Sequence, residues 1–327
     1  MSENARLLDD MAERMFAQFL SDPLDRLDTN MPARLKAAAD EAGLSLTLLP
    51  EDAGGMGATL EEAAIVAWRA GYHAAPVPIV TLLLAPTLGD LPVALDDLAL
   101  AAPGSDVAEG PAGHIALVSA TGIAIHKAEY AFEALDHRPW VRATGPALHV
   151  IAATGLAERL AMQGAVLTAA AMLGAMDKIL DTTITYANTR KQFGRALSAF
   201  QAIQHRLADA AEEYTITQAA LAGAVRAIDG GWSRPVLWQS AKVQSARAAS
   251  SVAACAHQIL GAIGFTEEHE LHHYTKKLWV WRDAWGRQSA LESAIGGAAA
   301  AHDDGLWSFI ADTPADTIPA ARAGEAA

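Results

Sequence analysis

Cysteine is almost absent from this chain, since Cys255 is the only one in 327 residues. A single cysteine cannot form an internal disulfide, and it excludes metal sites built from several thiolates. Structural disulfides belong mainly to oxidising compartments, so their absence favours a reducing, cytoplasmic location. Residues 1–9 are acidic with one arginine, and no sustained apolar run follows them, so we expect no secretory signal.

Positive charge is scarce as well. The chain has 24 lysine and arginine residues against 38 aspartate and glutamate residues, which gives a formal net charge of −14 and a pI near 5.1. Nucleic-acid binding requires a broad basic face, so we expect no nucleic-acid partner. An acidic substrate must be met by local positive groups.

Long apolar runs are missing too. No stretch consists of the roughly 18 apolar residues that a membrane span needs, so we expect a soluble protein without a membrane span. Hydrophobic residues nevertheless make up 52% of the chain, which is enough for a large core. The length fits one multi-layered protomer or two to three small domains.

The first region, residues 1–90, has helical spacing in three stretches separated by turns. These stretches are about residues 4–20, 31–42 and 58–71. Thr59 followed by Glu62 has the spacing of a capping box at the start of the third stretch. Pro76 and Pro78 prevent that helix from continuing. We predict an N-terminal helical domain.

The second region, residues 91–153, changes to short alternating runs. Apolar residues stand two apart in three places: Ile115 and Leu117, Ile123 and Ile125, and Leu148 and Val150. Alternation of this kind indicates strands with one buried face, and Gly122 and Gly145 punctuate the runs. We predict a small, reduced β domain of three to five strands.

The third region, residues 154–312, is helical. Its clearest pattern has apolar residues three or four apart from Phe200 to Ile228, which predicts one long amphipathic helix. Further helices are expected at about residues 157–189, 234–262, 268–285 and 288–302. Four antiparallel helices form a bundle, so the predicted fold class is α+β, mainly α, with a C-terminal four-helix bundle. Residues 313–327 lack an apolar period and are expected to be a disordered tail.

Three motifs, in this order along the chain, resemble the acyl-CoA dehydrogenase family. The loop at Leu49-Pro-Glu-Asp-Ala-Gly-Gly-Met-Gly57 is similar to the family's N-terminal glycine loop. The segment from Arg190-Lys-Gln-Phe-Gly to Gln201 resembles its Arg-x-x-Phe-Gly…Gln motif. The segment Gln258-Ile-Leu-Gly-Ala-Ile-Gly-Phe265 resembles its Gln-x-x-Gly-Gly-x-Gly-[Phe/Tyr] element, with Ala262 in place of the second glycine. Together the ordered matches are far more specific than one glycine-rich piece.

The resemblance implies that this chain contributes to an FAD site. The residues that match the cofactor-binding motifs are Arg190, Gln192, Phe193, Gln201, Gln258, Gly261 and Gly264. An arginine offers a planar fork to a pyrophosphate, a phenylalanine offers an apolar face, and glycines allow close approach of the backbone. In the family these groups reach FAD across a subunit interface, so an oligomer is implied. The simpler roles remain open: Arg190 as a capping or surface group, Phe193 and Phe200 as core, and Gly261 as a helix cap.

The catalytic base of the family is not found where the resemblance places it. Acyl-CoA dehydrogenases need a carboxylate to take the α-proton of the thioester. In many members it belongs to a Tyr-Glu-Gly-Thr stretch, and Trp285 holds that position here. In others it lies on the helix before the arginine motif, at a position that counts back to Gly164. Glu158 is the nearest acid and would need a gap of about six residues, so the catalytic residue is left unknown with Glu158 as a weak candidate.

Two other features bear on the site. The family's flavin-ring stretch, Thr-Glu-Pro…Gly-Ser-Asp, is echoed only faintly by residues 102–107, at an early position in a shortened β region. His269, His272 and His273 lie close together, but they lack a matched third ligand and the family uses no metal, so we expect no metal site.

A chain that keeps FAD-edge residues but lacks the base resembles the small subunits of heteromeric acyl-CoA dehydrogenases. The resemblance implies a larger partner subunit that supplies the base, an acyl-CoA substrate, possibly a bulky steroid-derived one, and an electron-transfer flavoprotein as acceptor. Two alternatives stay open. One is a self-sufficient homo-oligomeric dehydrogenase that uses Glu158 or another acid, and the other is a non-catalytic scaffold with the same fold.

Overall fold

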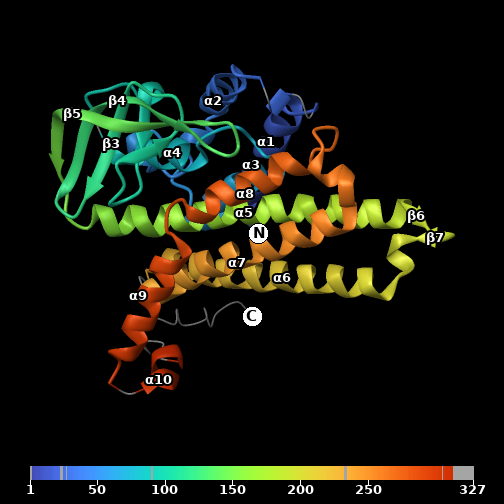
Figure 1. Ribbon diagram of the computed structural model, residues 1–327. Coiled ribbons are helices and arrows are strands. Elements are labelled where there is room, and N and C mark those ends of the chain that lie inside the picture. Colours follow the sequence, from blue (N-terminus) through green and yellow to red (C-terminus); the bar gives the residue numbers. More distant parts are fainter. Residues whose placement is uncertain are drawn as a thin grey trace, which may run out of the picture.

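Four long antiparallel helices form the body of the molecule (Figure 1). The computed structural model describes residues 2–22, 25–26, 28–89, 91–231, 234–303 and 305–311. The four helices are α5 (Leu156–Thr189), α6 (Gln201–Asp229), α7 (Pro235–Leu260) and α8 (Leu271–Asp283). The sheet covers one end of the bundle, and the N-terminal helices pack beside it. The predicted mainly helical fold is confirmed, whereas the division into separate domains stays a prediction, and the predicted tail lies outside the described residues.

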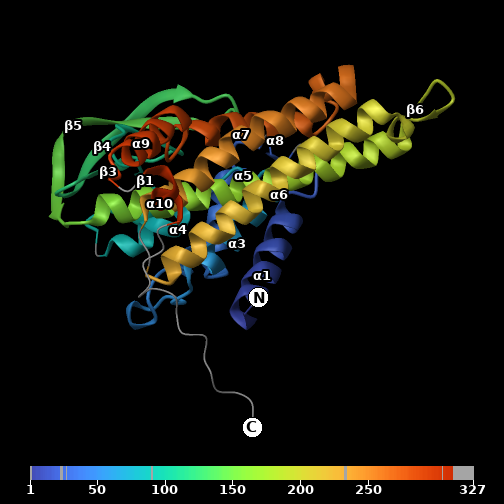
Figure 2. The ribbon, with the colours of Figure 1, turned by 90° about the horizontal axis from the view of Figure 1, so that it is seen from below.

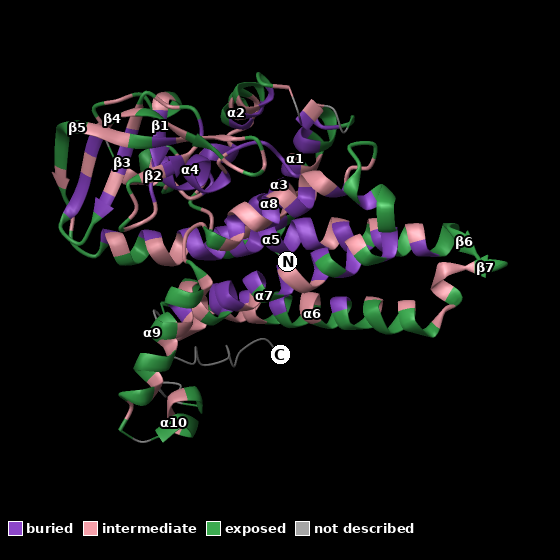
Figure 3. Cartoon of the chain, viewed as in Figure 1, coloured by how far each residue is buried: buried purple, intermediate pink, exposed green. Residues whose placement is uncertain are grey.

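Helix α5 is the centre of the core, because every residue from Gly164 to Met176 is buried (Figure 3). Small alanine and glycine side chains let the neighbouring helices approach it closely. Alanine also raises hydropathy: α5 and the segment 235–265 are both long and apolar enough to cross a membrane by length and composition alone. Our prediction that no stretch is that apolar was therefore wrong by this measure. Of the apolar window in α5, 78% is buried by the chain itself, as expected for a core helix.

The N-terminal helices are α1 (Glu3–Phe19), α2 (Met31–Glu41), α3 (Leu60–Tyr72) and α4 (Ile79–Leu84). The predicted capping box is confirmed: the Thr59 hydroxyl accepts from the Glu62 N–H, and the Glu62 carboxylate accepts from the Thr59 N–H. Asp229, at the end of α6, accepts hydrogen bonds from the Leu60 and Glu61 N–H groups at 2.9 Å, so the bundle caps the same helix start. Helix α4 was not predicted from the sequence.

The sheet has five strands in the order β1-β3-β4-β5-β2. They are β1 (Leu98–Leu100), β2 (Val107–Glu109), β3 (His114–Ser119), β4 (Gly122–Glu133) and β5 (Pro139–Ala152). Only the β1–β3 pair is parallel; β3, β4, β5 and β2 pair antiparallel in turn. Ile123 and Ile125 pack into the main core, whereas Ile115 and Val141 belong to a small second core with Ala99. The predicted count of three to five strands agrees with this sheet.

Two features extend beyond the body of the molecule. A short hairpin, β6 (Lys191–Gln192) and β7 (Arg195–Ala196), projects between α5 and α6 at the end of the bundle away from the sheet. At the other end, α9 (Gln288–Ala300) and α10 (Gly305–Ala311) lead away from the bundle (Figures 1 and 2). The hairpin and α10 were not predicted from the sequence.

Candidate functional site

The arginine motif forms the tip of the projecting hairpin. Phe193 and Gly194 connect β6 to β7, and both have positive φ, 52° and 82°. A two-residue loop with both φ values positive is the arrangement that closes a tight hairpin, but it is unfavourable for a bulky side chain. The Phe193 ring is 91% exposed and meets Phe200 edge-on at 6.2 Å between centroids. Phe193 is therefore not core, and Phe200 is only partly buried.

Arg190 stands at the base of this hairpin, where α5 ends. Its backbone N–H donates to the Tyr186 carbonyl at 2.8 Å, and its carbonyl accepts from the Leu197 N–H at 2.9 Å. The side chain is exposed and has no hydrogen bond or ion pair to any described residue. Arg195 differs, because its guanidinium lies 4.0 Å from the centre of the Phe200 ring. The backbone of Arg190 is thus fixed while its guanidinium is free to bind a ligand.

The glycine motif lies at the same end of the bundle, where α7 ends (Figures 1 and 2). Gly261 terminates the helix with a φ of 63°, and no atom lies within 4 Å of the position its Cβ would take. A Cβ on Gly264 would instead lie 3.0 Å from Leu260 and 3.3 Å from Leu271, so packing within the chain explains that glycine. Phe265 is 73% exposed and stacks on His257 at 4.4 Å.

The glutamines of the two motifs are also exposed at this end. Gln192 lies on β6, Gln201 begins α6, and Gln258 is in the last turn of α7. None of the three has a side-chain hydrogen bond to a described residue, whereas the Gln204 amide donates to the Ser198 carbonyl at 2.8 Å. Free amides, a free guanidinium and exposed rings fit the pyrophosphate and adenine part of FAD. The two motifs therefore lie at the same end of the bundle, and the contacts of their residues with FAD stay a prediction.

The second part of the site is a cavity of about 870 Å³ between the sheet and the end of α8. The stretch 102–107, which only faintly echoes the family's flavin-ring segment, lines it opposite Trp279, Trp281 and Trp285. The Ser105 hydroxyl is already used, since it donates to the Val107 carbonyl at 2.9 Å. The cavity thus has an aromatic wall, and the Ser105 hydroxyl on its loop forms its hydrogen bond within the chain.

Trp285 and Gly164, the two positions where the resemblance places a base, touch each other. A Cβ built on Gly164 would lie 2.0 Å from Cε3 of Trp285, so the indole packs directly on the glycine. Neither position offers a carboxylate. Glu158 is exposed in the first turn of α5 and is not among the residues that line the cavity. Gly164, Trp285 and Glu158, the positions to which the resemblance points, therefore place no carboxylate in the cavity.

Glu109, at the end of β2, is a carboxylate that the sequence reasoning missed. It lines this cavity and is only partly exposed. Its pKa is raised to about 7, first by burial and also by Asp136, against the lowering effects of Lys277 and Arg138. A carboxyl group with such a pKa is suited to proton transfer near neutrality. Nothing in its short strand distinguishes it from a surface glutamate.

Lys242 fixes the end of α8 just before Trp285. Its side chain is fully buried, and its Nζ donates to the carbonyls of Trp281 and Arg282 at 3.1 and 2.9 Å. These are carbonyls of the last turn, which have no partner within the helix. Burial lowers the pKa of Lys242 to about 7, although Asp283 raises it.

The pKa of Lys242 predicts a pH-dependent contribution to stability. Between pH 7 and the unfolded value of about 10.4 the unfolded chain binds a proton that the folded chain does not, so stability rises with pH in this window. In Lys242→Met this slope is absent. We expect the free energy of unfolding of the original chain, relative to the variant, to rise by roughly 1 kcal/mol per pH unit between about pH 8 and 9.5. Urea unfolding across this range measures it, and parallel pH profiles would contradict it.

Comparisons with known proteins agree with this geometry. Residues 154–305 match the family described as acyl-CoA dehydrogenase, C-terminal domain. The acyl-CoA dehydrogenase IpdE2 of Mycobacterium tuberculosis is 30% identical over 275 residues, which cover 78% of this chain and 80% of that protein. The crystal structure of the ChsE4-ChsE5 complex from Mycobacterium tuberculosis is similar with a TM-score of 0.81 at 20% identity, covering 92% of this chain and 98% of that one.

A variant of the Tcur3481-Tcur3483 steroid ACAD is also similar, with a TM-score of 0.76 at 21% identity, covering 91% of this chain and 98% of that one. At these identities the solved structures establish the fold. The match to IpdE2 extends over most of both chains and establishes more than the fold. The chain belongs to the acyl-CoA dehydrogenase family of FAD-dependent oxidoreductases.

Proposed function

We propose that this chain is the small subunit of a heteromeric acyl-CoA dehydrogenase. The observation that carries the proposal is the contact between Trp285 and Gly164, because an indole fills the place where the family's carboxylate is expected. An indole cannot abstract a proton, so the base comes from a larger partner subunit. Bound FAD supplies the hydride acceptor for α,β-desaturation of the acyl-CoA thioester.

The contribution of this chain is the hairpin end of the bundle. Arg190, Gln192 and Phe193 present free groups outward, and the exposed backbone of Gly261 and the amide of Gln258 lie at the same end. These groups bind the pyrophosphate and adenine part of an FAD whose ring lies in the partner. Exposed Phe193 and Phe265 support a subunit contact here, since solvent-exposed aromatic rings are typical of interfaces.

The proposed substrate is a bulky, steroid-derived acyl-CoA, and the proposed electron acceptor is an electron-transfer flavoprotein. Support for the partner and substrate comes from the similar structures, one of which is a two-protein complex and another a steroid ACAD. The proposed location is the cytoplasm, in agreement with the single cysteine.

Glu109 favours a second candidate function, a self-sufficient dehydrogenase. Its carboxyl group lines the cavity and has a pKa of about 7, as a base on this chain would need. A self-sufficient dehydrogenase requires no partner subunit, and in such an enzyme Glu109→Gln would abolish turnover. Glu158, exposed and away from the cavity, offers less to such a mechanism.

One experiment separates these readings. The chain is purified alone and after co-expression with a longer acyl-CoA dehydrogenase of the same organism, and flavin absorbance and acyl-CoA-dependent dye reduction are recorded. We expect FAD and turnover only in the complex, with Glu158→Gln changing turnover less than about twofold because Glu158 is exposed and does not line the cavity. Turnover by the chain alone, lost in Glu109→Gln or Glu158→Gln, would establish the self-sufficient enzyme. Absence of flavin from both samples would leave a scaffold.

A further inference from the structure

An apolar cavity of about 690 Å³ lies between α2, α4 and the start of the sheet. Its volume is within the usual range for sites of small molecules. None of the residues predicted to hold FAD lines it. It meets the larger cavity that Trp285 lines at Pro78, Thr81 and Glu109, but no aromatic side chain of a described residue belongs to its own wall. The apolar cavity is therefore a space of its own beside the candidate site.

Helix α2 turns one side toward the apolar cavity. Five of its residues line the cavity at helical spacing: Pro32, Ala33, Lys36, Ala37 and Asp40. A different side of the helix packs into the core through Met31, Leu35 and Ala39. Ala33 and Ala37 are small and exposed, so this side of the cavity stays open to a ligand.

Apolar side chains form most of the remaining wall, from α4, β1 and the segments before them: Leu46, Val77, Leu82, Ala85, Leu95, Leu98 and Ala99. Lys36 is the one cation among the described lining residues, and Asp40 pairs with it at 2.9 Å. The other charged lining residues, Asp96 and Glu109, are acids. A carboxylate or phosphate would lose its hydration here without gaining a free positive charge, so the wall disfavours an anion.

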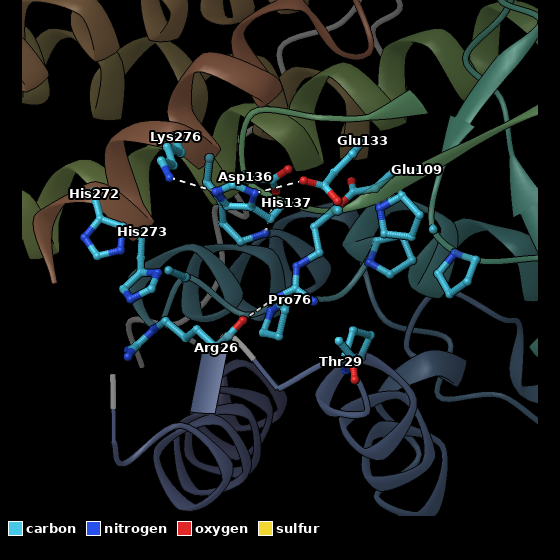
Figure 4. Close-up of a pocket in the computed structure, with 18 of the residues that line it drawn as sticks. Arg26, Thr29, Pro76, Glu109, Glu133, Asp136, His137, His272, His273 and Lys276 are labelled. Carbon is cyan, nitrogen blue, oxygen red and sulfur yellow. Dashed lines mark hydrogen bonds and ion pairs between the residues drawn. The ribbon is translucent and has the colours of Figure 1, made fainter. Parts of the chain in front are cut away.

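Charged side chains gather instead in a neighbouring polar cavity (Figure 4). Figure 4 shows His273 and Lys276 on one side of that cavity and Glu133 on the other. The polar cavity shares Pro78 and Glu109 with the apolar cavity. The two adjoining spaces thus differ in polarity, and the apolar one suits an uncharged molecule.

Ser45 places a hydroxyl in the apolar cavity. It belongs to the short helical turn η2 (Leu44–Leu46), is 6% exposed and lines the cavity. No described residue forms a hydrogen bond with this hydroxyl, yet it is not one of the fully enclosed unpaired atoms. Its oxygen therefore keeps accessible surface, and a ligand in the cavity can reach it.

Thr81 adds a second hydroxyl, on α4. It is 7% exposed, and its oxygen accepts from the Leu100 N–H at 3.3 Å. Its own hydroxyl hydrogen is given to no acceptor among the described residues, so Thr81 can still donate one hydrogen bond. A ligand that fills the cavity displaces water from Ser45 and has to replace the lost hydrogen bond. A pure hydrocarbon cannot do so, whereas a ligand with an oxygen atom can.

We propose that the apolar cavity binds an uncharged, apolar ketone or alcohol, with the ligand oxygen on the Ser45 hydroxyl and the hydrocarbon part against the leucines. The apolar wall requires a mainly hydrocarbon molecule, the paired Lys36 excludes an anionic one, and Ser45 requires an oxygen. The site requires neither FAD nor a partner subunit, so it goes beyond the proposed function.

The test uses four naphthalene probes that carry, at the same ring position, an acetyl, an ethyl, a carboxylate or an aminomethyl group. Equilibrium dialysis is performed on the full chain, in complex with its partner where it requires one. We expect the acetyl probe to bind roughly 3- to 10-fold more tightly than the ethyl probe, because it gains one neutral hydrogen bond. The two charged probes should bind more weakly than the ethyl probe, because they lose hydration.

Ser45→Ala should lower the affinity for the acetyl probe to that for the ethyl probe, which should itself bind as before. The substitution should not destabilise the chain, since the hydroxyl has no partner among the described residues. Ala37→Trp places an indole at the open side of the cavity and should weaken binding of both uncharged probes at least about 10-fold. Ala37 is exposed, so this variant still tests the site if Ser45→Ala folds poorly.

The matched control is Ala290→Trp, the same substitution at an exposed alanine that lines the larger cavity beside Trp285. It should leave the affinity for the acetyl probe unchanged. Loss of binding in Ala290→Trp but not in Ala37→Trp would place the probes in that larger cavity and overturn the proposal. Equal binding of the acetyl and ethyl probes, tightest binding of a charged probe, or no saturable binding of any probe would overturn it as well.

Discussion

Replacing Arg190 by glutamine is expected to weaken FAD binding by the assembled enzyme roughly 10- to 100-fold, because a charged hydrogen bond is worth about 1.5–3 kcal/mol. The substitution should not disturb folding. The backbone of Arg190 holds the end of α5 through its N–H and carbonyl, whereas its side chain contacts no described residue through a hydrogen bond or ion pair. This variant should therefore keep the free energy of unfolding of the original chain, while its affinity for FAD falls.

Flavin retention after desalting and titration of the apo-complex with FAD measure the effect. Turnover lost in Arg190→Gln should return at high FAD concentration, which a folding defect would not allow. The control is Arg226→Gln, an exposed arginine near the opposite end of α6. An unchanged affinity for FAD in Arg190→Gln would remove the arginine motif from the proposed site, even if the complex is active.

The two longest helices could be predicted for different reasons: the buried residues of α6 follow the helical period, whereas α5 is a long alanine-rich run that is buried on all sides in its middle. Predicted stretches at about 157–189 and 200–228 correspond to α5 at 156–189 and α6 at 201–229. The elements that were missed carry no such period. Helix α4 is only six residues long and all six are buried, so its run of apolar residues does not distinguish helix from strand. The hairpin has two residues on each side and depends on positive φ at Phe193, which propensity disfavours.

The same distinction holds for the candidate site: some of its features could be predicted from the sequence and others could not. The order of the motifs along the chain predicted that Arg190 and Gln258 both contribute to an FAD site, and the fold places both motifs at one end of the bundle. The contact between Trp285 and Gly164 joins residues far apart in sequence, so no local pattern indicates it. Asp136 and Lys277 likewise pair across the chain, and the sequence gives each only as a surface charge. Local sequence motifs identified individual residues, but only the packing of the chain shows which of these residues are in contact.

Replacing Gly174 by alanine should lower the free energy of unfolding by roughly 2–4 kcal/mol, because α3 leaves no room for a methyl group. The added Cβ would lie 1.9 Å from the Trp68 carbonyl oxygen and 2.8 Å from the Tyr72 nitrogen. These are backbone atoms of α3, so a rotamer change cannot relieve the clash. The same crossing brings Gly71 of α3 against α5, where a Cβ would lie 1.8 Å from the Ala171 carbonyl oxygen.

The matched control is Gly223→Ala, the same substitution inside α6 at a position with no atom within 4 Å of the added Cβ. Alanine is the better helix former, so this variant should gain about 0.5–1 kcal/mol. Urea midpoints followed by far-UV circular dichroism should move in opposite directions for the two variants. If Gly174→Ala unfolds at the midpoint of the original chain, α3 and α5 do not cross at backbone contact. The last turn of α3 would then pack on α5 through side chains and not through its backbone at Trp68 and Tyr72.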